Sequence, residues 1–245
     1  MTRSGSYPQE AARRTTLAAA RRAEAGDRLS ALRSRVLKRA QEIRILDPVL
    51  VREFILDRQQ RKCDAHDEVW EGVYVVPPLA NNPHQRLVGA LGNVLFQVVT
   101  LEEKGDVLPG ANVSDRDEGW EYSFRDPDIV VVLKGGRAVD CTTHWMGGPD
   151  FLTEIETRKG EAAAKLPFYE RIIVREVLVV ERNSRQLRLY RHDGRRLTVV
   201  SPQRFEGGKW YASEVVPLAF RRRGLRSGAV IEIRRTDGQP GHWMI

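Results

Sequence analysis

The sequence is poor in cysteine, because Cys63 and Cys141 are the only two in a chain of 245 residues. A disulfide framework or a cysteine-based zinc site requires more thiols at closer spacing. His144 lies near Cys141 in the sequence, but two further ligands at a spacing suited to zinc are not evident. We therefore interpret both cysteines as inert thiols in a reducing cytosol.

Long apolar runs are also missing. No stretch approaches the roughly 20 residues that a membrane-spanning helix needs. The first residues, Met-Thr-Arg-Ser-Gly-Ser, lack the apolar core of a secretion signal. We expect a soluble, cytoplasmic protein with no membrane partner. Aromatic residues make up only 7% of the chain and no basic stripe runs between them, which argues against stacking on single-stranded nucleic acid.

The chain carries a net charge of +7, and this excess is confined to its first part. Residues 1–45 hold eleven basic and four acidic side chains, an excess equal to that of the whole chain. The remaining residues balance to zero. Attraction for nucleic-acid phosphates would therefore come from this N-terminal segment or from local patches such as Arg221–Arg223.

The N-terminal segment shows helical periodicity. Apolar residues recur at spacings of three and four, a stripe formed by Leu29, Leu32, Val36, Ala40 and Ile43. Three interpretations are open: a helix packed on the body, an arm that contacts DNA, or a poorly ordered extension. Pro48 suits the start of a second short helix that continues to Arg61. We take residues 1–60 as a basic helical extension.

The rest of the chain alternates between strand and helix patterns, as is typical of α/β folds. The expected strands are 69–76, 129–133, 151–156, 176–181, 186–192 and 195–200, the expected helices are 84–103 and 161–171, and a loop covers 104–119. This pattern predicts a central mixed sheet flanked by helices in a domain over residues 61–200. A β-rich C-terminal extension, residues 201–245, is expected to pack on that domain.

Three residues in this order suit a divalent-metal site. Asp128 stands at the start of the buried apolar strand 129–133, Glu154 lies on the next central strand, and Lys165 follows on a helix. Carboxylate oxygens are the ligands that Mg²⁺ and Mn²⁺ prefer. Such a metal activates water and polarises a phosphate, while an ammonium offsets the developing charge. The set predicts phosphodiester hydrolysis.

The surrounding motifs carry a family resemblance. In chain order they are Asp67-Glu68-Val-Trp-Glu71-Gly72, Val75-Val-Pro-Pro78, His84-Gln85, Pro127-Asp128-Ile-Val-Val, Gly148-Pro-Asp-Phe-Leu-Thr-Glu154-Ile155, Lys165-Leu-Pro-Phe-Tyr169 and Val174-Arg-Glu-Val-Leu-Val-Val180. Over roughly residues 65–200 the chain resembles the Uma-type (Uma-two) putative restriction endonuclease family of the PD-(D/E)xK nuclease superfamily. The resemblance implies a restriction-endonuclease-like fold and a Mg²⁺- or Mn²⁺-dependent endonuclease acting on DNA. It also implies Asp128 and Glu154 as metal ligands and Lys165 as the catalytic lysine.

The chain departs from the family after Glu154. Where the family has a small apolar residue and Ser-Pro, this sequence has Glu156-Thr157-Arg158-Lys159. Residues two apart on a strand share a face, so Glu156 is either a third metal ligand or a sign that the site is damaged. Lys159 rivals Lys165 for the ammonium role, although the family motif favours Lys165.

Two more residues are candidates for lining the active-site cleft. His84 matches a family motif but is equally suited to packing at a helix start. Glu71 could reach the metal through water, or could simply be solvated.

Two functions from different classes follow. The first is a DNA endonuclease, for which a homodimer is an attractive arrangement because duplex cutting requires two active sites or two events. The alternative is a catalytically inactive nuclease fold that serves as a DNA-binding or interaction module.

Overall fold

The computed structural model describes residues 43–62, 64–78, 80–157, 160–205, 207–226 and 228–245. These residues fall into two compact units. The smaller unit takes in the described residues up to Asp67 together with Val73–Leu79, and the larger takes in Glu68–Gly72 and the chain from Ala80 onward. The part of the predicted extension over residues 1–42 lies outside the described residues. The helix expected from its apolar stripe stays a prediction there.

The smaller unit contains two strands and one helix. Strand β1 (Ile43–Ile45) pairs antiparallel with β3 (Val73–Val76), and α2 (Pro48–Gln60) follows β1. The helix expected to begin near Pro48 is therefore confirmed. The assignment of Ile43 to a helix is wrong, because pairing with Val76 holds this residue in an extended strand.

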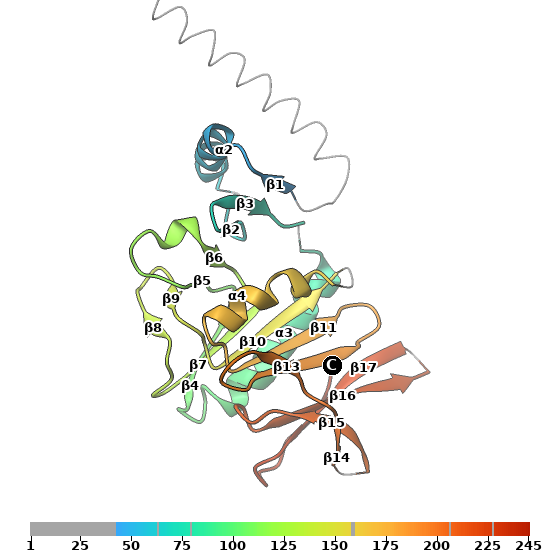
Figure 1. Ribbon diagram of the computed structural model, residues 1–245. Coiled ribbons are helices and arrows are strands. Elements are labelled where there is room, and N and C mark those ends of the chain that lie inside the picture. Colours follow the sequence, from blue (N-terminus) through green and yellow to red (C-terminus); the bar gives the residue numbers. More distant parts are fainter. Residues whose placement is uncertain (1–42, 63, 79, 158–159, 206, 227) are drawn as a thin grey trace, which may run out of the picture. The chain divides into compact units, whose positions relative to one another are not determined.

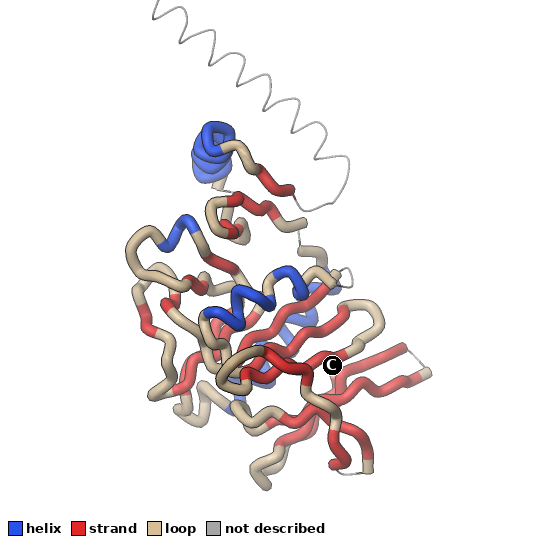
Figure 2. Tube along the Cα trace, in the orientation of Figure 1, coloured by secondary structure: helices blue, strands red, loops and turns tan. Residues whose placement is uncertain are grey.

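The larger unit is built on a six-stranded mixed sheet. Its order is β13-β12-β11-β10-β7-β4, in which β10 and β11 are parallel and the other pairs antiparallel. The strands are β4 (Gly105–Pro109), β7 (Ile129–Leu133), β10 (Phe151–Glu156), β11 (Glu176–Glu181), β12 (Leu187–His192) and β13 (Leu197–Val199). Figure 2 shows that strands predominate over helices in this unit. The predicted central mixed sheet is confirmed.

Helices cover both faces of this sheet (Figure 1). Helix α3 (Asn82–Val98) packs its apolar stripe against one face, and its first turn is capped by the Asn81 side chain, which accepts from the His84 N–H. The opposite face is covered by the short 3₁₀ turn η2 (Ala162–Ala164) and helix α4 (Leu166–Arg171). Because the central strands are apolar on both sides, they suit this buried position.

The expected strand 69–76 is wrong in one respect, because a turn divides it. The structure has β2 (Glu68–Trp70) and then β3, separated by Glu71 and Gly72 with φ angles of 47° and 85°. Two successive positive φ values reverse the chain, and glycine adopts one of them without steric cost.

The expected loop 104–119 is also wrong, since it contains β4 and β5 (Val113–Ser114). Glycine, aspartate and proline disfavour strands locally. Pairing of every β4 residue with β7 outweighs that preference.

The expected helix over 161–171 is divided between η2 and α4, and the expected helix over 84–103 ends at Val98 instead. Lys165 lies at the junction between η2 and α4, where it is the N-terminal cap residue of α4. Pro167 falls in the first turn of α4, where its missing N–H has no intrahelical partner to lose. No described helix is long and apolar enough to cross a bilayer.

Two further sheets complete the larger unit. Five strands follow the order β2-β6-β5-β9-β8, with β6 (Phe124–Arg125), β8 (Val139–Asp140) and β9 (Trp145–Met146), and the 3₁₀ turn η1 (Trp120–Tyr122) precedes β6. The C-terminal residues form an antiparallel sheet in chain order, with β14 (Gln203–Phe205), β15 (Gly208–Ala212), β16 (Leu218–Leu225), β17 (Gly228–Arg235) and β18 (His242–Met244).

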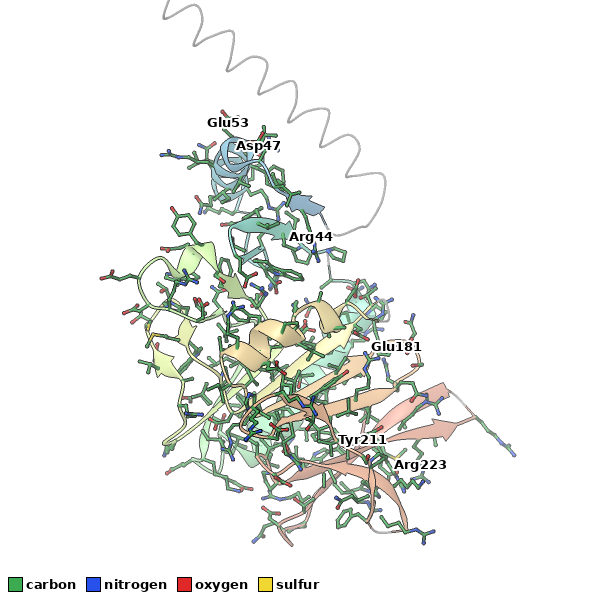
Figure 3. The ribbon with its side chains drawn as sticks, in the orientation of Figure 1. Arg44, Asp47, Glu53, Glu181, Tyr211 and Arg223 are labelled. Carbon is green, nitrogen blue, oxygen red and sulfur yellow. The ribbon has the colours of Figure 1, made fainter. Side chains whose placement is uncertain are left out.

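The C-terminal sheet is amphipathic. Apolar side chains such as Phe220 and Ile233 join the same core as α3. The other face holds the buried Glu232, which accepts from Arg221 and Arg223 (Figure 3 labels Arg223 on this sheet). Strand alternation thus places the apolar residues inward and the ion-paired residues outward.

Candidate active site

Glu154 occupies the middle of the central sheet. It lies on β10 between the parallel neighbour β11 and the start of β7, and its side chain is on the face that α4 covers. Only 6% of this residue is exposed. A carboxylate in such a position is costly unless cations or hydrogen bonds compensate its charge.

Lys165 supplies that compensation. Its Nζ lies 3.1 Å from Glu154 Oε1 and 3.2 Å from Oε2, and 2.8 Å from Glu68 Oε1. The Tyr169 hydroxyl, one turn further along α4, also donates to Glu154 Oε1. The proline-containing start of α4 therefore aims an ammonium and a phenol at the same carboxylate.

Glu68 is a member of this cluster that sequence reasoning did not assign to the site. It is 3% exposed, and its oxygens accept from the Asp126 N–H at 2.9 Å and from the Trp70 indole N–H at 2.6 Å. The residue stands in the first family-like motif, which was the available signal. Its inward orientation depends on the pairing of β2 with β6, which local sequence does not reveal.

The Asp128 side chain reaches the backbone of β10 next to Glu154. Its Oδ2 accepts from the Ile155 N–H at 2.7 Å, directly after Glu154, and its Oδ1 lies 3.2 Å from His84 Nε2. The Asp128 carboxylate thus contacts β10 beyond the last residue pair of β7 and β10. Side-chain exposures of 21% for Asp128 and 18% for Lys165 leave the cluster open to solvent at these two groups.

The carboxylates of the cluster lie close together, and the positive charge beside them does not fully offset their mutual repulsion. Burial, together with repulsion from Asp128 and Glu68, raises the pKa of Glu154 to about 7 against the opposing effect of Lys165. Burial by itself would lower the pKa of Lys165, but the attraction of Glu154 and Glu68 outweighs it and raises that pKa. The hydrogen bond to Asp128 is the main reason that the pKa of His84 is raised.

This donor set fits a hard divalent cation. Three carboxylates, Glu68, Asp128 and Glu154, surround one ammonium, so one more cation would reduce their mutual repulsion. Among them Asp128 and Glu154 are the pair with which a cation could be held, because their side chains are 21% and 8% exposed, against 3% for Glu68. Oxygen donors of this kind suit Mg²⁺ or Mn²⁺.

Glu156 has a different set of partners. One of its oxygens accepts from the backbone N–H groups of Gly160 and Ala162, each at 3.0 Å, and the other from the Arg188 guanidinium. It shares a strand face with Glu154, but these bonds commit it to the turn before η2. Its role as a third metal ligand stays a prediction, and the rival Lys159 lies outside the described residues.

Glu71 is likewise engaged elsewhere. Its carboxylate pairs with Arg125 at 3.3 Å and with Arg171 at 2.6 Å. Burial would raise the pKa of Glu71, but these two guanidinium groups lower it. Arg125 lies against the rings of Trp70 and Phe168, at 4.6 Å and 4.2 Å from their centroids. The structure brings His84 to Asp128, whereas it places Glu71 in an arginine pair beside the cluster.

Comparisons with known proteins were made for the whole chain. The sequence model of the family described as "Uma2: Putative restriction endonuclease" matches residues 53–223. No curated protein matches the chain. A solved structure similar to this one is that of a putative nuclease belonging to DUF820 from Anabaena variabilis, with 14% sequence identity and a TM-score of 0.43. The match covers 54% of this chain and 75% of that one.

Proposed function

The chain belongs to the Uma2 family of putative restriction endonucleases, and from this premise we propose that it is a metal-dependent endonuclease hydrolysing DNA phosphodiester bonds. The observation that carries the proposal is the contact of Lys165 with Glu154, beside the hydrogen bond that the Ile155 N–H donates to the Asp128 carboxylate. An acidic pair with an adjacent ammonium is a residue set that suits metal-dependent phosphodiester hydrolysis.

Asp128 and Glu154 would hold the cation, Mg²⁺ or Mn²⁺. When bound, such a cation supplies Lewis-acid polarisation of the phosphate and lowers the pKa of water. Glu156 remains a candidate for a third ligand only if its bonds to Gly160, Ala162 and Arg188 rearrange.

The residues of this chain would orient and neutralise the reacting groups. Lys165 fixes Glu154 and presents positive charge toward a phosphate on the exposed side of the cluster. Tyr169 holds the Glu154 carboxylate through its hydroxyl, and His84 holds that of Asp128. This preorganisation stabilises charge that develops on a transferring phosphoryl group without reorganising the site.

DNA is the proposed partner, and the protein would act in the cytoplasm. A homodimer would supply the second active site that a double-strand break requires. Linear plasmid appearing without a nicked intermediate would support the dimer, and strictly sequential nicking would speak for single sites.

A second function, an inactive nuclease fold that binds DNA, is favoured by one observation. The Glu156-Thr157-Arg158 segment departs from the family, and the Glu156 oxygens are already bonded within the protein. Metal binding by calorimetry in a protein that never cuts DNA would favour this alternative.

The decisive experiment is supercoiled-plasmid nicking by the purified full chain in Mg²⁺, Mn²⁺ or EDTA. We expect metal-dependent nicking that falls at least about 100-fold in Asp128→Ala and in Lys165→Ala, because Asp128 would hold the cation and Lys165 would offset the charge that develops on the phosphate. Asp106→Ala and Lys134→Ala, at exposed positions in β4 and after β7, are matched controls and should cut normally. Normal cutting by Asp128→Ala would overturn the site assignment.

A further inference from the structure

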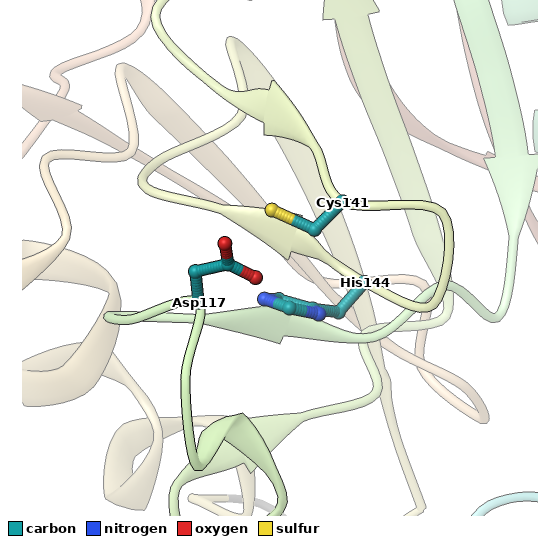
Figure 4. Close-up of side chains that lie close together, drawn as sticks. All are labelled: Asp117, Cys141 and His144. Atoms are coloured by element: carbon teal, nitrogen blue, oxygen red, sulfur yellow. The ribbon is translucent and has the colours of Figure 1, made fainter.

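A second cluster of metal-binding side chains lies away from the carboxylates described above. Figure 4 shows Asp117, Cys141 and His144 directed toward one another. One ligand atom from each lies within 4.8 Å of the others. Asp117 follows β5, whereas Cys141 and His144 belong to the turn between β8 and β9. Residues 24 positions apart are thus assembled by the fold.

The turn itself holds the cysteine and the histidine together. The Cys141 N–H donates to the His144 carbonyl at 3.0 Å, which closes the hairpin between β8 and β9. Within it Thr142 has a φ of 72°, a conformation that a β-branched residue seldom adopts. The Asp140 carboxylate stabilises this conformation by accepting from the Thr142 N–H at 2.7 Å. The hairpin is therefore held in one geometry despite its strain.

Sheet pairing then brings Asp117 to this turn. Strand β9 runs parallel to β5, with Trp145 opposite Val113, and the Trp145 N–H donates to the Asn112 carbonyl at 2.8 Å. The chain leaving β5 consequently passes beside the hairpin turn. The local sequence around Asp117 reveals neither the pairing of β5 with β9 nor the hydrogen bond from Trp145 to Asn112.

His144 is oriented as a ligating histidine would be. It is buried and stacks on Trp120, with ring centroids 4.7 Å apart and planes at 15°. Its Nδ1 lies 3.1 Å from the Thr143 hydroxyl and its Nε2 lies 2.9 Å from the Arg116 carbonyl. Whichever nitrogen binds a cation, the other has a partner that fixes the tautomer, as is usual for metal-bound histidines.

The ligand types select the class of cation. A thiolate and an imidazole with one carboxylate suit zinc and similar transition metals, whereas Mg²⁺ prefers oxygen ligands alone. Asp117 is exposed and Cys141 half-buried, so solvent can reach the cluster. Three protein ligands leave a fourth tetrahedral position for water.

We propose that Asp117, Cys141 and His144 form a binding site for a zinc-type divalent cation that fastens the β8–β9 hairpin to the chain after β5. The site is separate from the carboxylate cluster in residues and in ligand chemistry. The Cys141 thiol and the Asp117 carboxylate are also groups that can pair by a hydrogen bond, and their ligand atoms lie within 4.8 Å. The experiment must therefore separate metal ligation from a hydrogen-bonded cluster.

The test is a titration of the metal-depleted full chain with Co²⁺, followed by Zn²⁺. Cobalt bound by a thiolate gives a sulfur-to-metal charge-transfer absorption, which we expect to saturate at one equivalent and to vanish when Zn²⁺ displaces it. Cys141→Ser should abolish the band. Cys63→Ser is the matched control and should keep it, while Mg²⁺ should not compete.

Asp117→Asn is a second variant that should keep the fold, because this residue is exposed. We expect it to weaken Co²⁺ binding more than about tenfold, because loss of a direct ligand costs at least as much as the roughly 10- to 100-fold typical of a residue that only supports a ligand. Zn²⁺ should also raise the melting temperature of the wild type and not that of Cys141→Ser. Absence of the band in the wild type, or a band that survives Cys141→Ser, would overturn the proposal. The band should also persist in Asp128→Ala, and its loss there would place the cobalt at the carboxylate cluster and overturn the proposal.

Discussion

Two buried carboxylates, those of Glu154 and Glu68, share the ammonium of Lys165. The three residues come from β10, β2 and the start of α4, so the ion pairs connect elements that are distant in the chain. Breaking a buried pair by removing one partner leaves an uncompensated charge in a poorly solvated place. The contact that supports the proposed chemistry should therefore also support the fold.

At the residue scale we predict that Lys165→Met destabilises the metal-free protein. The loss should be about 3 kcal/mol in the free energy of unfolding, because both carboxylates lose their cation. Urea unfolding in EDTA measures it, with Lys134→Met as an exposed control expected to stay within about 0.5 kcal/mol of the wild type.

The same variant tests metal binding without an activity assay. If Asp128 and Glu154 bind Mg²⁺, the cation should raise the melting temperature of Lys165→Met more than that of the wild type, because it replaces the missing positive charge. An equal shift in both proteins would argue that Mg²⁺ binds elsewhere.

At the scale of elements, the pairing of β4 with β7 decides the edge of the central sheet. A Cβ on Gly105 would lie 2.2 Å from the Val132 carbonyl oxygen. Such a distance is far below van der Waals contact, so the backbones of β4 and β7 can approach this closely only because residue 105 has no side chain. Gly105 disfavours a strand by its local preference, but the close approach of β4 to β7 requires a glycine at this position.

We predict that Gly105→Ala lowers the free energy of unfolding by about 1 to 3 kcal/mol, the range for overpacking a tight contact. Gly89→Ala is the matched control, because a Cβ there meets nothing within 4 Å and the residue lies inside α3. It should stabilise the protein by up to about 1 kcal/mol through helix propensity. Chemical denaturation of both variants checks the opposite signs, and a neutral Gly105→Ala would contradict the close approach.

At the scale of the whole molecule, charge and family likeness occupy different parts of the chain. The family match covers residues 53–223, whereas the net charge of +7 equals the excess held by residues 1–45. Long-range attraction to DNA would then come mainly from a segment outside the matched region. Binding and cutting are expected to depend on different residues.

This separation predicts the salt dependence of DNA binding. Replacing Arg35, Lys38 and Arg39 by Gln should reduce the slope of log affinity against log salt by about 2 to 3, because each lost phosphate contact releases about one counterion fewer. Fluorescence anisotropy across salt concentrations measures the slope. An unchanged slope would exclude the DNA-contacting arm and leave a packed helix or a poorly ordered extension. Replacing Arg221–Arg223 instead tests the patch on β16.

The sequence by itself determined the core of the larger unit. The runs 129–133, 151–156 and 176–181 are strands β7, β10 and β11 with the expected bounds. A continuous apolar run of this length is typical of a strand that is buried on both faces of a sheet. Burial and strand preference therefore both predict a central strand. The family motifs and the residue types suited to a metal site grouped Asp128, Glu154 and Lys165, and in the structure Asp128 accepts from the Ile155 N–H while Lys165 contacts Glu154.

Only the tertiary structure decided which polar residues join these three. Glu68 entered the cluster and Glu156 was bonded elsewhere, although Glu156 shares a strand face with Glu154. Strand β4 and the junction in front of α4 also departed from local propensity. The periodicity of a sequence predicts which face of a strand a residue occupies. Which residues that face then contacts depends on strand pairing, on turn conformation and on partners distant in the chain. For the same reason Asp117 could not be connected with Cys141 and His144 until β5 and β9 were known to lie side by side.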